Sequence, residues 1–184
     1  MDSKQKFTDL MVDIETLGTK SYALILSVAI VEFNMITGEI GDNIYLKISI
    51  NDSLLNDFKI EGDTLIWWMN QDKDAKIVFD NKNSFKCVDA LTHITKFILN
   101  KEYLKIWGNS ARFDLGLLQN YYNKFNMNIP WKYGNERDVR TLVDFYPDIK
   151  KELVFDGIKH DALADCLHQI KYCSLIYNKI KKDN

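Results

Sequence analysis

The chain has 184 residues, 46% of them hydrophobic, and a formal net charge of −2. This length and composition predict a single domain over residues 1–184 with a substantial core. The small net charge excludes the broad basic surface of a nonspecific nucleic-acid coat protein. A polyanionic partner would therefore have to bind through local contacts.

The first predicted strand, residues 11–18, ends in two acids before a turn. Side chains alternate faces along a strand, so Asp13 and Glu15 point to one side and the apolar Val12 and Ile14 to the other. Two adjacent carboxylates repel each other unless a cation lies between them. The pair therefore indicates a metal site, and the alternative is two ordinary surface acids at a strand end.

Two further strands are expected to follow and complete an antiparallel meander. Residues 24–33 are almost uniformly apolar, which predicts a strand buried on both faces, and residues 44–48 form the third strand. Asp63 is then expected to cap a short helix that ends at Met69, and residues 85–99 have the apolar spacing of a longer helix.

The second half of the chain alternates strand and helix. A strand over residues 104–107 precedes a helix carrying Asp114 to Phe125, and helices are predicted over residues 139–146 and 162–180. Strand-then-helix units add parallel strands to a sheet. The predicted fold class is α/β: a mixed five-stranded sheet, antiparallel meander first and parallel strands next, flanked by helices.

Asp114 is the second informative acid, because it falls in line with Leu117 and Tyr121 on the apolar face of its helix. A carboxylate buried there costs several kcal/mol unless a cation or strong donor pairs with it. Arg112 is two positions away and faces elsewhere on a helix. A metal ion held by the strand acids would satisfy Asp114 directly.

Asp165 lies beside the apolar stripe of the last helix, and alone it would be a solvated acid. His160 precedes it by five residues, just before Asp161, which can cap the helix. A loop histidine has a near-neutral pKa, which suits a base that takes a proton from water. The alternative for His160 is an exposed loop residue without a role in chemistry.

Four acids from three distant segments and one loop histidine are the composition of a two-metal phosphodiesterase. Carboxylates suit Mg²⁺ or Mn²⁺, and two such ions about 3.5 to 4 Å apart can clamp a scissile phosphate. Zinc is disfavoured because neither His nor Cys clusters at ligand spacing.

The three acidic segments resemble the motifs of the DEDDh branch of the DnaQ-like 3′-to-5′ exonucleases, which have a ribonuclease H-like fold. The matching stretches are residues 13–18, 109–114 and 160–165. Residues 66–71 and 137–141 are similar to a group that contains bacteriophage exonuclease A and small bacterial exoribonucleases. The resemblance runs from Leu10 to Tyr177, and Ser110 departs from it, standing where many relatives have glycine.

The resemblance implies that Asp13, Glu15, Asp114 and Asp165 hold two Mg²⁺ or Mn²⁺ ions and that His160 is the general base. Several further side chains are candidate substrate contacts. One of the paired tryptophans can stack on a terminal base, whereas the other is expected to pack on the core. Arg137 can contact phosphate or belong to an ion-pair cluster with Asp138 and Arg140. The candidates are Thr16, Leu17, Trp67, Trp68, Asn109, Phe113 and Arg137.

The expected function is a 3′-to-5′ exonuclease that hydrolyses phosphodiester bonds at the 3′ end of DNA, preferably single-stranded, and releases nucleoside 5′-monophosphates. The alternatives are an exoribonuclease with the same chemistry and an inactive nucleic-acid-binding module. The odd number of cysteines, three, predicts a reducing compartment, and no stretch reaches the roughly 18 apolar residues of a membrane span. We expect a cytoplasmic protein, in the host cytoplasm if it comes from a phage, whose partner is a nucleic acid and not a membrane.

Overall fold

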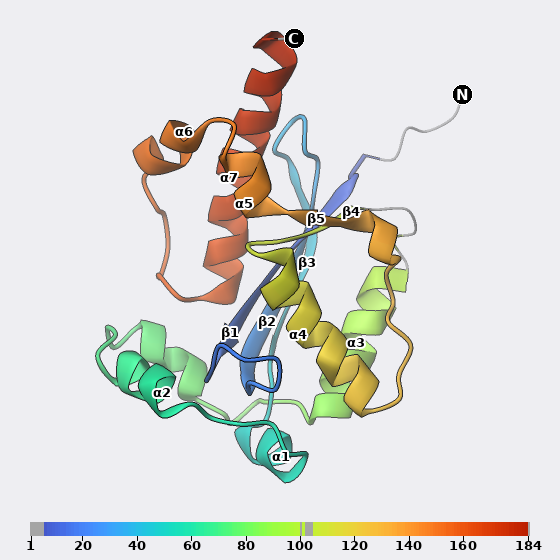
Figure 1. The fold of residues 1–184 in the computed structure, drawn as a ribbon, viewed down its shortest axis with the longest axis vertical. Helices are drawn as coiled ribbons and strands as arrows, with labels where there is room; N and C mark the ends of the chain where they lie inside the picture. Colours follow the sequence, from blue (N-terminus) through green and yellow to red (C-terminus); the bar gives the residue numbers. More distant parts are fainter. Residues whose placement is uncertain (1–5, 100, 102–104, 184) are drawn as a thin grey trace.

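One mixed sheet organises the chain. The structure, a computed structural model, describes residues 6–99, 101 and 105–183. Five strands lie in the order β3-β2-β1-β4-β5 (Figure 1). β1 pairs with β2 in antiparallel and with β4 in parallel orientation, which confirms the predicted meander followed by parallel strands. The strands are β1 (Asp9–Thr16), β2 (Ile25–Phe33), β3 (Ile40–Lys47), β4 (Lys105–Gly108) and β5 (Glu136–Asp138).

The predicted strands agree with the structure in the middle of the sheet, whereas the bounds of strands toward its edges differ. Every residue of β2 is buried, as the continuous apolar run predicted. The third strand begins at Ile40, four residues before the predicted start, because its first residues are polar or exposed and carry no apolar signal. The predicted strand residue Leu104 lies outside the described residues.

Helices cover both faces of the sheet (Figure 1). Alternate β1 residues serve two separate cores: Leu10 and Val12 pack with buried residues of α3 and α4, whereas Met11 packs with α7. In the described part of the chain, no helix has the length and apolar character that crossing a bilayer requires. The helices are α1 (Ile50–Leu55), α2 (Gly62–Met69), α3 (Cys87–Leu99), α4 (Ala111–Lys124), α5 (Val139–Val143), α6 (Pro147–Glu152) and α7 (Ala162–Asp183), with 3₁₀ turns η1 (Ala75–Phe79) and η2 (Tyr133–Asn135).

Three helix predictions were wrong in detail. Glu61, not Asp63, occupies the cap position of α2, and Asp63 lies within its first turn. The polar loop after β3 contains α1, which Ser49 caps by accepting a hydrogen bond from the Asp52 backbone. The predicted helix over residues 139–146 ends at Val143, because the residue before Pro147 disfavours helical backbone angles.

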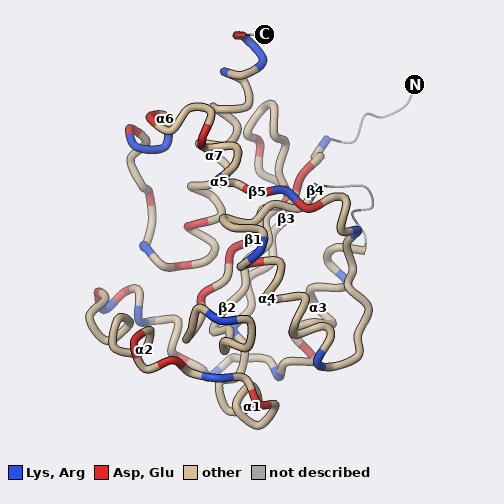
Figure 2. Tube along the Cα trace, viewed as in Figure 1, with Lys and Arg blue, Asp and Glu red and all other residues tan. Residues whose placement is uncertain are grey.

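The charged residues show no single basic face. Lys and Arg are scattered among Asp and Glu over the described part of the trace (Figure 2), as the net charge of −2 led us to expect. The three cysteines are free and buried.

An irregularity in the β1–β2 pairing lies at the end of β1. The register shifts between Glu15 and Thr16. On the partner strand, the Ile25 N–H donates to the Tyr121 hydroxyl of α4 at 2.8 Å. The Tyr121 ring stacks on Phe58 with centroids 3.6 Å apart. Helix α4 thus satisfies a backbone donor of the central sheet next to the strand acids.

Replacing Tyr121 by Phe leaves the Ile25 N–H buried without its acceptor. We expect the free energy of unfolding to fall by about 1 to 3 kcal/mol. Urea denaturation measures this change. Tyr133→Phe is the matched control, because Tyr133 is 88% exposed and should lose almost nothing. Equal stabilities of the two variants would contradict the assigned role of the Tyr121 hydroxyl.

Candidate active site

Three of the predicted acids converge on one face of the sheet. Asp13 and Glu15 lie on the β1 face that packs against α7, because Met11, which shares their side of the strand, belongs to the core formed with that helix. Asp165 comes from the first turn of α7. One oxygen from each of the three carboxylates lies within 4.8 Å of the other two. The backbone therefore brings together acids that are about 150 residues apart in the chain.

Asp114 approaches the same place from α4. Its side chain is 4% exposed, which confirms that it points inward. The Ser110 N–H donates to its Oδ2 at 3.2 Å. Gly108 at the end of β4 makes this approach possible, since a Cβ there would lie 3.0 Å from the same Oδ2. Arg112 is exposed and makes no ion pair in the described part of the chain.

The four acids disfavour one another's charge. Burial, followed by the negative charges of Asp114 and Glu15, raises the pKa of Asp13 well above its usual range. Burial, followed by the charge of Asp165, raises the pKa of Glu15 to about 8. Burial also raises the pKa of Asp114 to about 7 and that of Asp165 to about 6, although backbone N–H groups oppose both shifts.

Such a group of carboxylates fits a divalent cation. Its donors are hard oxygen ligands, which Mg²⁺ and Mn²⁺ prefer, and a bound cation would offset both the burial that raises these pKa values and the repulsion that adds to it at Asp13 and Glu15. Asp114 lies outside the set whose ligand atoms fall within 4.8 Å of one another. It is nevertheless close enough for its charge to raise the pKa values of Asp13 and Glu15.

Gln169 is a site residue that sequence reasoning missed. Its Nε2 donates to Asp13 Oδ1 at 2.7 Å, and its side chain is 3% exposed. The Gln169 Oε1 has no hydrogen-bond partner among the described residues. Gln169 follows Asp165 by four residues on α7, so the two share a helix face, and this spacing was the available signal.

His160 lies beside the acids on the loop that enters α7. Its backbone N–H donates to Asp165 Oδ2 at 3.1 Å, and its φ of 64° is in the left-handed region. Burial, followed by the charge of Lys159, lowers the pKa of the imidazole below its usual value. The Asp161 side chain accepts from the Ala164 N–H at 3.0 Å, which confirms the predicted cap of α7.

The paired tryptophans have different environments. Trp68 is 1% exposed, and its indole N–H donates to the Thr16 carbonyl at 2.8 Å, which fixes α2 to the end of β1. Trp67 is 43% exposed, and its ring meets the His160 ring edge-on with centroids 4.8 Å apart. The expectation that one tryptophan packs on the core is confirmed for Trp68, whose ring is not available for stacking.

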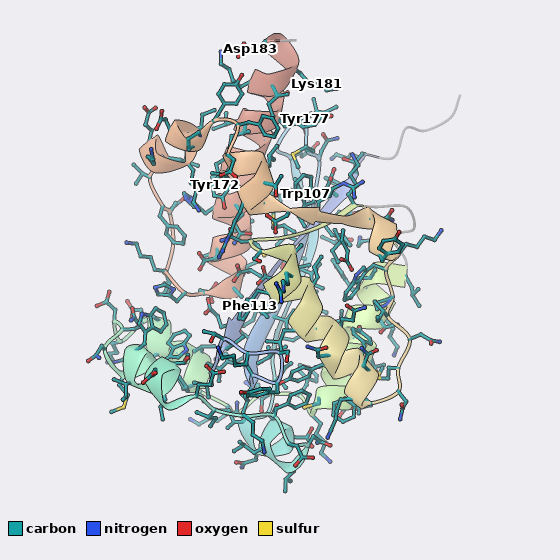
Figure 3. All side chains as sticks on the ribbon, in the orientation of Figure 1. Trp107, Phe113, Tyr172, Tyr177, Lys181 and Asp183 are labelled. Carbon is teal, nitrogen blue, oxygen red and sulfur yellow. The ribbon has the colours of Figure 1, made fainter. Side chains whose placement is uncertain are left out.

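A cavity of about 420 Å³ adjoins the acids. Glu15, Trp67 and Phe113 line it, with Phe113 at the start of α4 (Figure 3). Thr16 also reaches this cavity, but its hydroxyl donates to the Gly18 carbonyl at 2.6 Å. Leu17 is 2% exposed, so the expected wedge against a terminal nucleotide is not supported by its position.

The remaining substrate candidates serve the backbone. The Arg137 guanidinium donates to the carbonyls of Gly134 and Glu136 at 2.9 and 2.7 Å, which holds the turn before β5. The Asn109 carbonyl accepts from Arg140 Nε at 3.1 Å, and the Asn109 Oδ1 is buried without a partner among the described residues. Arg137 and Arg140 thus donate to backbone carbonyls, and neither forms an ion pair with any residue that the structure describes.

Comparison with known proteins gives related results at three levels. The family model of the 3′-5′ exoribonuclease Rv2179c-like domain matches residues 8–177. A protein of Enterobacteria phage T4 named exodeoxyribonuclease is 22% identical over 88% of this chain and 86% of its own length.

Solved structures give the third comparison. E. coli Exonuclease I in complex with a dA16 oligonucleotide superposes with a TM-score of 0.69 at 16% identity, covering 96% of this chain and 42% of the other. Exonuclease I from Methylocaldum szegediense has a TM-score of 0.66 at 15% identity, covering 94% and 41%. The chain thus spans less than half the length of these solved structures, and the likeness establishes the fold.

The raised pKa values predict how pH affects stability without metal. The unfolded chain ionises these acids near their usual pKa, 4.5 for glutamate, whereas folded Glu15 keeps its proton to about pH 8. The folded state therefore binds more protons between these values, so the free energy of unfolding falls as pH rises through this window. Urea denaturation in EDTA across the window measures it. A rise in stability with pH would contradict the assignment.

Asp13→Asn should separate repulsion from metal binding. The amide can still accept the bond from Gln169 but removes an acid whose ionised form the fold disfavours, as its raised pKa shows, so the metal-free protein should gain about 1 kcal/mol near neutral pH. Wild-type protein at a hundred times the dissociation constant of Mn²⁺ gains about 2.7 kcal/mol, or roughly 5 to 10 °C in Tm, which the variant should largely lose. Thermal melts measure both. The exposed Asp148→Asn is the control, and an undiminished Mn²⁺ shift in Asp13→Asn would refute the metal site.

Proposed function

We propose, since this chain belongs to the 3′-5′ exoribonuclease Rv2179c-like domain family, that it removes nucleoside 5′-monophosphates from the 3′ end of single-stranded nucleic acid. The chain is a nuclease of the hydrolase class with 3′-to-5′ exonuclease function. The observation that carries the proposal is the set of three carboxylates within 4.8 Å, with Asp114 beside them and a cavity adjoining Glu15.

Asp13, Glu15, Asp114 and Asp165 would hold two divalent cations, Mg²⁺ or Mn²⁺. When bound, such ions supply positive charge at the phosphate and acidify a coordinated water. Asp114 is buried and the other three acids are partly buried, and the four carboxylates lack a neighbouring lysine or arginine within ion-pair distance among the described residues. Gln169 keeps Asp13 in one orientation through its 2.7 Å bond.

His160 is the proposed general base. Its lowered pKa keeps the imidazole neutral near physiological pH, so a ring nitrogen can accept a proton from the attacking water. The bond from its backbone N–H to Asp165 holds the loop next to the acids. The contact with Trp67 limits the orientations of the ring. The base is thus positioned by one acid of the cluster and by α2.

The cavity beside Glu15 would receive the terminal nucleotide. Trp67 presents an exposed ring there, and stacking of a base on an aromatic ring contributes about 1 to 3 kcal/mol with little dependence on sequence. Phe113 of α4 also lines this cavity. Trp68 supports this surface from below through its bond to Thr16.

Single-stranded DNA is the proposed substrate. The phage relative is named an exodeoxyribonuclease and aligns over most of both chains, and E. coli Exonuclease I is solved with a DNA oligonucleotide. RNA is the second candidate, because the matching family is described as exoribonuclease. A contact to the 2′-hydroxyl would favour RNA. The free cysteines support a reducing compartment such as the cytoplasm.

Digestion of matched 5′-labelled single-stranded DNA and RNA with Mn²⁺ or Mg²⁺ tests the function. We expect ladders that shorten from the 3′ end, abolished by EDTA and slowed about 10² to 10⁴-fold in His160→Ala because the base is removed. The faster ladder identifies the preferred sugar. His160→Ala should keep the Mn²⁺-induced thermal shift, which shows that the variant folds and binds metal. Absence of shortening by metal-loaded wild type would favour the inactive binding module.

Trp67→Ala should weaken substrate binding more than it weakens the fold. The ring is 43% exposed, so we expect KM to rise about tenfold and the free energy of unfolding to change by less than about 1 kcal/mol. Trp68→Phe should affect the fold more than substrate binding: its free energy of unfolding should fall by about 1 to 3 kcal/mol because the buried hydrogen bond is lost. Steady-state kinetics and urea denaturation measure the two effects. An unchanged KM in Trp67→Ala would rule out stacking on this ring.

A further inference from the structure

A second cavity lies next to the one that holds the terminal nucleotide. We infer that it binds the strand upstream of the 3′ end, with Lys20 and Arg112 contacting backbone phosphates. This inference rests on the proposed function, because it extends the path of the same substrate. The chemical group that the cavity recognises is the phosphodiester of a single-stranded nucleic acid, one or more nucleotides away from the bond that is cleaved.

The two cavities adjoin each other. The second has a volume of about 560 Å³ and lies between the loop that joins β1 to β2 and one side of α4. Thr19 and Phe113 line both cavities, and Phe113 lies at the start of α4 (Figure 3), so the inferred path of the strand runs from the first cavity past Phe113 to the second. Volumes of this size lie within the range of ordinary ligand sites, about 300 to 1,000 Å³.

The charges of the two cavities differ. Glu15 and Asp63 line the first one, whereas the residues that line the second include Lys20 and Arg112 and no acid. Both cationic side chains are exposed, and neither charged head group makes a hydrogen bond or ion pair with a described residue. They come from separate elements, the β1–β2 loop and α4. Lys20 lies near enough to Glu61 for its charge to help lower the pKa of that carboxyl. Two exposed cations that line one groove without a direct ion pair among the described residues fit a polyanion.

The walls of this groove are held in place. Glu61 accepts hydrogen bonds from the Thr19 hydroxyl and the Lys20 N–H, both at 3.1 Å, and these contacts lower the pKa of Glu61. Asn120 Nδ2 on α4 donates to the Ser21 carbonyl at 2.8 Å. The loop is therefore tied both to the residue before α2 and to α4, so a strand would meet a preformed surface.

Gly116 gives an independent observation. It lies inside α4, where glycine destabilises a helix by about 1 kcal/mol relative to alanine. Packing does not require it, because a Cβ at this position would meet no atom within 4 Å. Gly116 lines the second cavity, so a longer side chain there would project into the groove. An open groove for a ligand accounts for a glycine at this position.

The test measures binding of a labelled octanucleotide and a dinucleotide by fluorescence anisotropy. It uses a His160→Ala background with Mn²⁺, in which cleavage should be slow enough for binding to be measured before the strands are shortened. Lys20→Ala and Arg112→Ala should each raise the Kd of the octanucleotide about three- to tenfold and that of the dinucleotide less. Each should also reduce the slope of log K against log salt by about 0.7, the value for one lost phosphate contact on a single strand.

Gly116→Gln keeps the inference testable if a charge change disturbs the fold. Glutamine is a better helix former, so the free energy of unfolding should be unchanged or higher, while the side chain obstructs the groove and raises the Kd of the octanucleotide. Lys181→Ala is the control cation, at the far end of α7 from Phe113 (Figure 3), and should leave both Kd values unchanged.

The outcomes separate this inference from the proposed function. A ratio of octanucleotide to dinucleotide Kd that equals the parent value in Lys20→Ala, Arg112→Ala and Gly116→Gln would overturn the groove assignment. Failure of the octanucleotide to bind the parent protein at all would do the same. Shortening of 3′ ends by wild-type protein is measured separately, so an active enzyme with an unused groove is distinguishable from a protein that is not a nuclease.

Discussion

Repulsion among buried carboxylates is the constraint on which the site depends. Asp13, Glu15 and Asp165 lie within 4.8 Å of one another, and Asp114 adds a fourth negative charge. Ionising all four in a metal-free protein opposes folding, as their raised pKa values show. The rest of the fold must therefore supply enough apolar burial to hold them together. β2, buried along its whole length between two cores, provides much of that support.

The chain places its recognition surfaces on elements that are tied to the strand carrying the acids. Trp68 anchors α2 to the Thr16 carbonyl, which leaves its neighbour Trp67 exposed beside His160. Glu61 ties the β1–β2 loop to the start of the same helix. These hydrogen bonds, 2.8 to 3.1 Å long, join groups far apart in sequence, so the positions of the surfaces follow from the position of β1. Acidic and basic cavities can then adjoin each other in a chain whose net charge is only −2.

The sequence predicted the positions of some site residues correctly and missed others, and each outcome has a physical reason. The β1 acids and the inward direction of Asp114 could be predicted because period-two and helical apolar patterns specify which face a side chain occupies. Gln169 was missed because its spacing of four residues from Asp165 indicates a shared helix face but not a partner, and the partner, Asp13, lies 156 residues away. Arg137 resembled a phosphate contact, but local carbonyls of its own turn satisfy its guanidinium. The third strand began early because its first residues are polar or exposed.

The sequence alone predicted the α/β class, the antiparallel meander with parallel strands and the identity of the clustered acids. Local periodicity and motif spacing depend only on neighbours in the chain. Other features followed only from folding. Long-range packing and buried hydrogen bonds decide which tryptophan is exposed and how α7 brings Asp165 to β1. They also decide that the two cavities adjoin each other. Such contacts join segments with no common sequence signal, and their energies are set by the geometry that the whole sheet imposes.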